Sequence, residues 1–219
     1  MRKQERYSLV AEKLKGLFPD ADTELNYNSP FQLLVAVILS AQCTDKRVNS
    51  VTPALFERYP DVKSMSESSQ EEIYSYIKSI SYPNAKSKNL KAMADRLHTV
   101  YNDEIPSDTD QLQTLAGVGR KTAMVMAAVL YKKAVMPVDT HVHRVSARIG
   151  LTTNAKNVLD TERQLLSNLK KENDLAAIHH QLILLGRYIC KARKPLCENC
   201  SLTMECKYYS SEIKKKKNK

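Results

Sequence analysis

The sequence predicts an all-α protein of about ten helices. Only five of its 219 residues are glycine, and no long stretch alternates apolar with polar residues as a half-buried strand would. Apolar residues recur instead at the three- and four-residue spacing of amphipathic helices. Four series show this spacing: Val10, Leu14 and Leu17; Ile73, Ile77 and Ile80; Leu90, Met93, Ala94 and Leu97; and Ile178, Leu182, Leu185 and Ile189.

Two further segments predict buried helices. Residues 31–41 are apolar on almost every side and follow Ser29-Pro30, a pair typical of a helix start. We therefore expect a central buried helix there, and a second one over residues 122–131. The turn-forming stretches 19–30, 82–84, 102–109 and 132–137 separate the helices.

Composition favours a globular protein with a polyanionic partner. The apolar fraction is 42% and the charged fraction 26%, which excludes a wholly disordered or fibrous chain. Lys and Arg outnumber Asp and Glu by 34 to 24, and the pI is about 9.3, as in many nucleic-acid binders. Residues 186–219 alone carry a net charge of +7. For the lysines at the very end (Lys214 to Lys217, and Lys219), a solvated tail is the preferred explanation over a contact with the polyanion.

No segment predicts a membrane span or a secretion signal. The longest aliphatic run, residues 33–39, is far shorter than the roughly 20 residues that cross a bilayer. The charged N-terminal residues are not followed by an apolar signal-peptide region. We expect a monomer in the cytoplasm, associated with the nucleoid if the source is bacterial.

Four cysteines cluster near the C-terminus. Cys190, Cys197, Cys200 and Cys206 are separated by six, two and five residues. Since disulfides are rare in a reducing compartment, such clustered thiols favour a metal centre. Zinc ribbons usually pair two C-x-x-C motifs across a long gap, whereas only one such motif occurs here. The spacing therefore favours an iron-sulfur cluster over zinc, and over four simply packed cysteines.

The segment between the first two of these cysteines is basic. Lys191, Arg193 and Lys194 lie on it, so a metal centre would hold a basic loop in a fixed shape against a phosphate backbone. Cys43 is remote in sequence and is most simply a small packed residue.

A glycine pair precedes the second apolar helix. Leu115, Gly117, Val118, Gly119 and Arg120 belong to the stretch Leu-Ala-Gly-Val-Gly-Arg-Lys. Glycines two apart permit a tight turn, and the N–H groups of the helix start that follows suit a phosphate. The spacing does not match a nucleotide P-loop. An ordinary turn between two helices is the alternative.

Lys121 follows this turn directly. The positive end of the helix dipole and the neighbouring Arg120 both oppose its ammonium charge, which favours the neutral amine. A neutral lysine amine is a nucleophile that forms Schiff bases with sugar carbonyl carbons. The alternative is a lysine that contacts phosphate or solvent.

Asp139 is the expected N-cap of a helix in which Val142, Val145 and Ile149 form the apolar face. A carboxylate in that place can stabilise a positive oxocarbenium-like centre or orient a nucleophile. Helix capping alone would explain Asp139 equally well. His141 and His143 are two residues apart and make a poor metal pair.

Together, the glycine turn with Lys121, Asp139 and the C-x6-C-x2-C-x5-C loop resemble the endonuclease III family of DNA base-excision glycosylases. The resemblance extends from the stretch Leu39-Ser40-Ala41-Gln42-Cys43-Thr44-Asp45 to Cys206. It implies a two-domain helix-hairpin-helix glycosylase fold. Residues 22–132 would form a six-helix barrel, and residues 1–21 with 133–219 a domain carrying a 4Fe-4S cluster, with the active site in the cleft between them.

The same resemblance implies an activity and roles for single residues. Lys121 would attack C1′ of a flipped, oxidised pyrimidine nucleotide in damaged duplex DNA, and β-elimination would then cut the strand 3′ to the abasic site. Asp139 would assist base loss, and Gln42 would fill the space left by the flipped base. Tyr82 lies near the place of an apolar wedge, although it is also consistent with simple packing. Ala116 and Ser81 depart from the usual proline and glycine of the family.

Two other functions remain open at this point. A related adenine-mismatch glycosylase shares the turn and the cysteine loop, but it lacks the lysine nucleophile and has an additional C-terminal domain. A non-catalytic DNA-binding module would use the turn and the cysteine loop only for docking.

Overall fold

A computed structural model describes residues 1–169 and 174–213. The described residues are helical with no strand, which confirms the predicted all-α class. The terminal lysines for which we considered a DNA-binding role, Lys214 to Lys217 and Lys219, lie outside the described residues. None of the described helices is long and apolar enough to cross a membrane.

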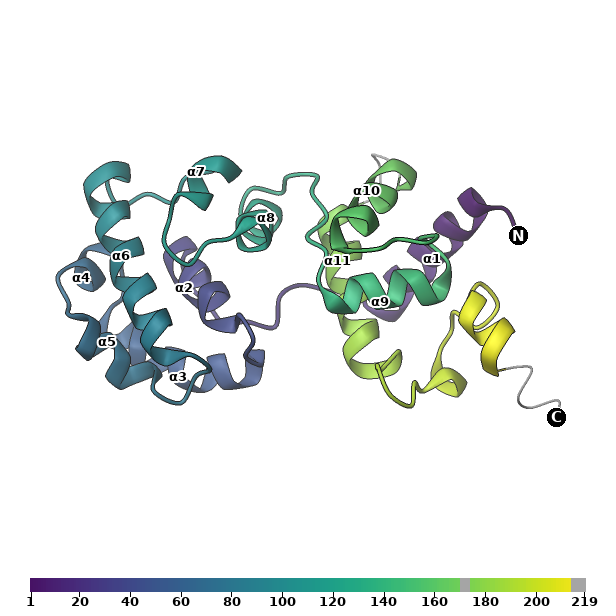
Figure 1. The fold of residues 1–219 in the computed structure, drawn as a ribbon, viewed down its shortest axis with the longest axis horizontal. Helices are drawn as coiled ribbons and strands as arrows, with labels where there is room; N and C mark the ends of the chain where they lie inside the picture. The colour runs from purple at the N-terminus through teal and green to yellow at the C-terminus, as the bar shows by residue number, and fades with distance from the viewer. Residues whose placement is uncertain (170–173, 214–219) are drawn as a thin grey trace. The chain divides into compact units, whose positions relative to one another are not determined.

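The chain divides into two compact units (Figure 1). Unit 2 is the continuous segment Glu24–Tyr131, and unit 1 combines Met1–Thr23 with Lys132–Lys219. Each unit has its own hydrophobic core, because no residue of one buried cluster belongs to the other. The chain therefore leaves unit 1 after its first helix and returns to it after Tyr131.

Unit 2 contains seven α-helices among its described residues. They are α2 (Pro30–Ser40), α3 (Asp45–Arg58), α4 (Val62–Ser66), α5 (Gln70–Ile77), α6 (Pro83–Tyr101), α7 (Thr109–Gln113) and α8 (Arg120–Val129). Helix α2 is the predicted central helix: every residue from Phe31 to Leu39 is buried. It packs against α3, α6 and α8, and α6 packs in turn against α4 and α5 (Figure 1).

The starts of these helices follow their sequence signals. Ser29 caps α2 through a hydrogen bond from the Gln32 N–H to its hydroxyl, and Pro30 occupies the first helical position. Ser69 and Glu72 form a reciprocal capping box at the start of α5. One prediction needs correction: Ile80 does not continue α5, which ends at Ile77, although Ile80 is buried in the turn that follows.

Unit 1 is built around α11. Its described helices are α1 (Lys3–Leu17), α9 (Thr140–Ile149), α10 (Val158–Asn168), α11 (Leu175–Leu184) and three short elements, η1 (Leu185–Ile189), η2 (Cys197–Asn199) and η3 (Tyr209–Ile213). Helix α11 packs against α1 and α9 and continues into the π-helical turn η1. The cysteine-bearing segment follows η1.

Unit 1 contains a buried histidine that links its stability to pH. His180 on α11 is 7% exposed, and its Nε2 lies 3.8 Å from the Asp22 carboxylate. Burial lowers the pKa of His180; Asp22 opposes this shift, whereas the charges of Lys132 and Arg187 add to it. The unfolded chain therefore takes up the proton at a higher pH than the folded chain does.

We expect the free energy of unfolding to decrease as the pH falls below about 6.5, the ordinary pKa of histidine. Urea unfolding at about pH 8 and about pH 5.5 measures this, and His180→Gln should reduce the difference. An unchanged pH dependence in His180→Gln would contradict the assignment.

Candidate active site

The glycine turn before α8 is anchored at two apolar positions. Leu115 and Val118 are both buried, at 2% and 6% exposure, and the Val118 N–H donates to the Leu115 carbonyl over 3.1 Å. Gly117 and Gly119 are both exposed. The apolar residues thus fix the turn to the core of unit 2, while the glycines lie at the surface.

The two glycines have different reasons to be glycine. Gly117 has φ +79, and a Cβ there would lie 3.1 Å from Asn89 Cβ and 3.2 Å from Ile38 Cγ2. Gly117 is therefore required both by its left-handed backbone and by close packing on α2 and α6. Gly119 has φ −85 and open space around it, so its backbone does not require glycine.

Gly119 is instead the N-cap of α8. It supplies no side-chain oxygen to the first N–H groups of that helix. A helix start without a side-chain cap on a glycine turn is a geometry that suits a bound phosphate. Arg120 and Lys121, the first two residues of α8, are both exposed and add positive charge to the same place.

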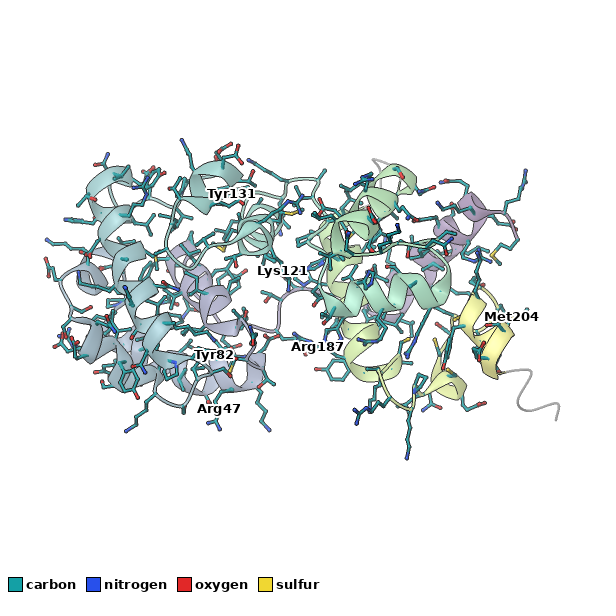
Figure 2. All side chains as sticks on the ribbon, in the orientation of Figure 1. Arg47, Tyr82, Lys121, Tyr131, Arg187 and Met204 are labelled. Carbon is teal, nitrogen blue, oxygen red and sulfur yellow. The ribbon has the colours of Figure 1, made fainter. Side chains whose placement is uncertain are left out.

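Lys121 stands at the start of a helix whose other face is in the core. Ala123, Met126 and Ala127 are fully buried, which holds α8 in one orientation and presents Lys121 at the surface of unit 2 (Figure 2). A side chain on such an anchored helix has a defined origin, as a nucleophile requires.

Asp139 caps α9, as predicted. Its Oδ1 accepts a hydrogen bond of 2.8 Å from the Val142 N–H, and its backbone carbonyl accepts one of 2.9 Å from the His143 N–H. The side chain is half-buried. The carboxylate is thereby fixed at the positive end of the α9 dipole. Asp139 belongs to unit 1 and Lys121 to unit 2.

The four clustered cysteines all lie in unit 1, and all four are half-buried and form no disulfide. Burial is the main cause that raises the pKa of Cys197, Cys200 and Cys206, and the Cys190 thiol raises each of them further. These thiols are thus close enough to interact electrostatically. Their thiolates need a cation to offset both effects, which a metal centre provides.

Helix α9 holds the segment that carries the first of these cysteines. Arg144 donates to the carbonyls of Gly186 and Cys190 over 2.9 and 3.2 Å. Arg148, one turn further on, donates to the Lys191 carbonyl over 2.7 Å and lies 3.5 Å from the Cys190 sulfur. The sequence did not lead us to predict a role for these two arginines, although their four-residue spacing places them on one face of the helix.

Helix α1 holds the end of the same segment. Lys13 donates to the Ser201 carbonyl and forms an ion pair of 2.8 Å with Glu205, a carboxylate that is 5% exposed. The Arg6 side chain donates to the Glu205 carbonyl over 2.9 Å. The last cysteine, Cys206, therefore follows a residue tied to the N-terminal helix.

The geometry of a single metal ion is not met in the part of the chain that the structure describes. No three Cys, His, Asp or Glu side chains there are grouped to hold one ion. His143 is directed elsewhere, with its Nδ1 2.7 Å from the Thr161 hydroxyl.

Gln42 and Tyr82 share an uncommon backbone conformation. Their φ angles are +54 and +58, in the left-handed region that residues other than glycine rarely adopt. Gln42 lies in the turn after α2, and Tyr82 is the N-cap of α6. Both side chains are exposed, Tyr82 by 64% (Figure 2). Because the Tyr82 side chain is so exposed, packing alone is a poor explanation for this residue.

The basic residues Lys191 and Arg193 are both exposed on the segment that leads away from Cys190. The Lys191 carbonyl is held by Arg148, and the next carbonyl, of Ala192, accepts from the same side chain over 2.9 Å. The backbone of this basic segment is therefore fixed by α9.

Residues 35–171 match the profile of the HhH-GPD superfamily of base excision DNA repair proteins. The endonuclease III of Bacillus subtilis (strain 168) is 42% identical over 204 residues, 93% of each chain. A solved structure described as a trapped endonuclease III-DNA covalent intermediate has a TM-score of 0.90 and 39% identity, over 97% of this chain and all of that one. A thermostable thymine-DNA glycosylase has a TM-score of 0.84 at 20% identity, over 94% of this chain and 97% of that one, which shows a shared fold.

Gly117→Ala should destabilise the protein by about 1–3 kcal/mol, because a left-handed backbone is unfavourable for alanine and the added Cβ meets Asn89 and Ile38. Urea unfolding measures the change. Gly119→Ala is the matched control: its Cβ would meet nothing within 4 Å, and we expect a loss below about 1 kcal/mol. Equal losses in the two variants would refute the difference drawn between the glycines.

Proposed function

Because the chain belongs to the endonuclease III family of the HhH-GPD superfamily, we propose that it is a base excision repair enzyme that removes damaged bases from duplex DNA and cleaves the strand. The observation that carries this proposal is Lys121 at the start of α8, behind a glycine turn that packs on α2 and α6. The solved endonuclease III complex with a trapped covalent bond to DNA supports a covalent mechanism.

The turn and the helix start bind the DNA backbone. Gly117 and Gly119 leave no side chain between a phosphate and the N–H groups, and Arg120 adds charge that attracts it. Leu115 and Val118 hold the turn rigid from below. These contacts carry no sequence information, as befits an enzyme that must find a lesion in any sequence.

Lys121 is the nucleophile. Its Nζ gives up a proton and forms a bond to C1′ while the bond between C1′ and the base breaks, and the base leaves with the electron pair and is protonated. The sugar ring then opens to a Schiff base. Loss of a proton from C2′ expels the 3′ phosphate, and water releases the lysine from the remaining sugar.

Asp139 assists the first step. Positive charge develops on the sugar as the base departs, and a fixed carboxylate stabilises it. The hydrogen bond from the Val142 N–H holds the carboxylate in place before the substrate arrives, so little reorganisation is needed.

The target nucleotide has to leave the stack, because C1′ is shielded in a duplex. We propose that Gln42 occupies the space that the base vacates and that Tyr82 inserts beside it as a wedge. Their exposure and left-handed backbones support such a role, since strained residues concentrate at functional sites. Oxidised pyrimidines are the proposed substrates, on the family resemblance.

The cysteine segment fits a 4Fe-4S cluster held by Cys190, Cys197, Cys200 and Cys206. Four thiols in one segment provide the ligands, and the burial that raises the pKa of Cys197, Cys200 and Cys206 creates the need for a positive centre. When bound, the cluster supplies a rigid crosslink. Lys191 and Arg193, whose backbone Arg148 holds, then present their charges to phosphate.

The two compact units have different roles in the proposed enzyme. Unit 2 would be the barrel domain and unit 1 the cluster domain, with the enzyme working as a monomer in the compartment that holds the DNA.

Borohydride should trap the protein covalently on duplex DNA that contains an oxidised pyrimidine, and Lys121→Gln should abolish the adduct. Denaturing gel electrophoresis measures the adduct. Lys63→Gln, at an exposed lysine of α4 in the same unit, removes the same charge and should still be trapped. A parent protein that gives no adduct would exclude the lyase activity and favour the docking module or the adenine-mismatch enzyme.

Asp139→Asn should retain DNA binding but slow base release by about 100-fold or more, measured by single-turnover excision. Asparagine caps a helix as well as aspartate does, so α9 should remain intact and the loss should reflect the missing charge. Thermal unfolding checks that the two proteins are equally stable. Excision at the parent rate would refute the role of Asp139.

Protein purified without oxygen should contain about four iron and four sulfide ions per chain. Cys197→Ala should lose both, since it removes one ligand, whereas Cys43→Ala should keep them. Metal analysis and the visible absorption of the cluster provide the measurements. Zinc without sulfide would overturn the assignment.

A further inference from the structure

Lys86 is a buried lysine at the centre of unit 2. Its side chain is 6% exposed, and it is the one lysine in the buried class among the described residues. The Nζ donates to the Leu39 carbonyl over 2.8 Å and to the Ala41 carbonyl over 2.7 Å. Burying an ammonium group costs free energy unless the group is well paired. A lysine at this buried position therefore needs a structural or functional explanation.

The two acceptors belong to the end of α2. The last carbonyls of a helix have no partner within the helix, and each of them here has another donor. The Ser40 hydroxyl bonds to the Val37 carbonyl, the Ala41 N–H to that of Ile38, and the Cys43 N–H to that of Ser40. Lys86 supplies the remaining two, and its positive charge is favourable at the negative end of the helix dipole.

Gln42 directly follows the second of these carbonyls. Its φ of +54 turns the chain sharply away from α2. Because Lys86 holds the Ala41 carbonyl and the Cys43 N–H holds that of Ser40, the residues on both sides of Gln42 are fixed. The direction in which Gln42 leaves the surface depends on this pair of bonds.

The backbone of Lys86 contacts the second exposed residue. Its N–H donates to the Tyr82 carbonyl over 3.1 Å, which is the first hydrogen bond of α6. Tyr82 precedes Pro83 and has a left-handed backbone. One residue thus bonds to the main chain at Tyr82 through its own backbone and next to Gln42 through its side chain.

We propose that Lys86 is a positioning residue that fixes the spacing of Gln42 and Tyr82, so that both can enter the duplex around one flipped nucleotide. This inference rests on the proposed function. A filling residue and a wedge can act together only if their separation matches the opened base pair, and a rigid link costs less to order on binding than two independent loops. Lys86 contacts neither the DNA nor Lys121 in this role.

The test compares Lys86→Met with the parent on two duplexes, one with an oxidised pyrimidine and one with a preformed abasic site. Methionine keeps the apolar stem but cannot donate to the carbonyls of Leu39 and Ala41. We expect single-turnover excision of the base to slow by about 10- to 100-fold, with a weaker fluorescence change of 2-aminopurine beside the lesion. Strand cleavage at the abasic site, where no base must be expelled, should change by less than about 3-fold.

Two controls separate positioning from general damage. Lys88→Met lies at an exposed position of the same helix and should behave as the parent. In a Gln42→Ala, Tyr82→Ala background, Lys86→Met should slow excision no further, because the residues it positions are absent. A purely structural role predicts that its effect persists in that background and falls equally on both duplexes, and either result would overturn the inference.

If Lys86→Met does not fold, Lys86→Gln provides the comparison. Its uncharged amide can still donate to one carbonyl, and the same selective loss on the lesion duplex is expected. Parent-like excision and fluorescence in a folded Lys86 variant would overturn the inference while leaving the proposed function intact. A parent protein that is never trapped on DNA is the different result that rejects the function itself.

Discussion

The burial of α2 is the constraint on which the candidate site of unit 2 depends. Every residue from Phe31 to Leu39 is buried, so the helix cannot shift without exposing apolar surface. Gly117 packs on Ile38 of α2, and Lys86 bonds to the carbonyls at its end. The glycine turn, the turn at Gln42 and the start of α6 therefore share one fixed reference.

Helix α9 is the element of unit 1 to which its candidate functional residues are anchored. Its first turn holds the Asp139 carboxylate, and its later turns hold the cysteine segment through Arg144 and Arg148. Glycines lie against both of its ends, with Gly186 packed on His141 and Gly150 closing the helix at φ +90. A proposed catalytic group and a proposed ligand segment are thus both anchored to one helix.

Much of the fold was predictable because its signals are local. Ser29-Pro30 and Asp139 cap helices in the structure as their sequence context indicates, and the series from Leu90 to Leu97 is buried along α6. Ile80 shows the limit of such reasoning: spacing alone extended α5 to a residue that is buried in a turn. Periodicity reports which residues face the core, and a buried turn residue satisfies it as well as a helical one.

The sequence alone determined the class of the protein, the family it resembles and the residues proposed for its chemistry, since helix propensity, capping and cysteine spacing act over a few residues. Tertiary structure decided the contacts between distant segments. Lys86 looks like any surface lysine of an amphipathic helix until the end of α2, some 45 residues earlier, is placed against it. The same holds for Arg148 and for the reason that Gly117, and not Gly119, must be glycine. Hydrogen bonds and close packing between segments depend on positions in space, which no local pattern encodes.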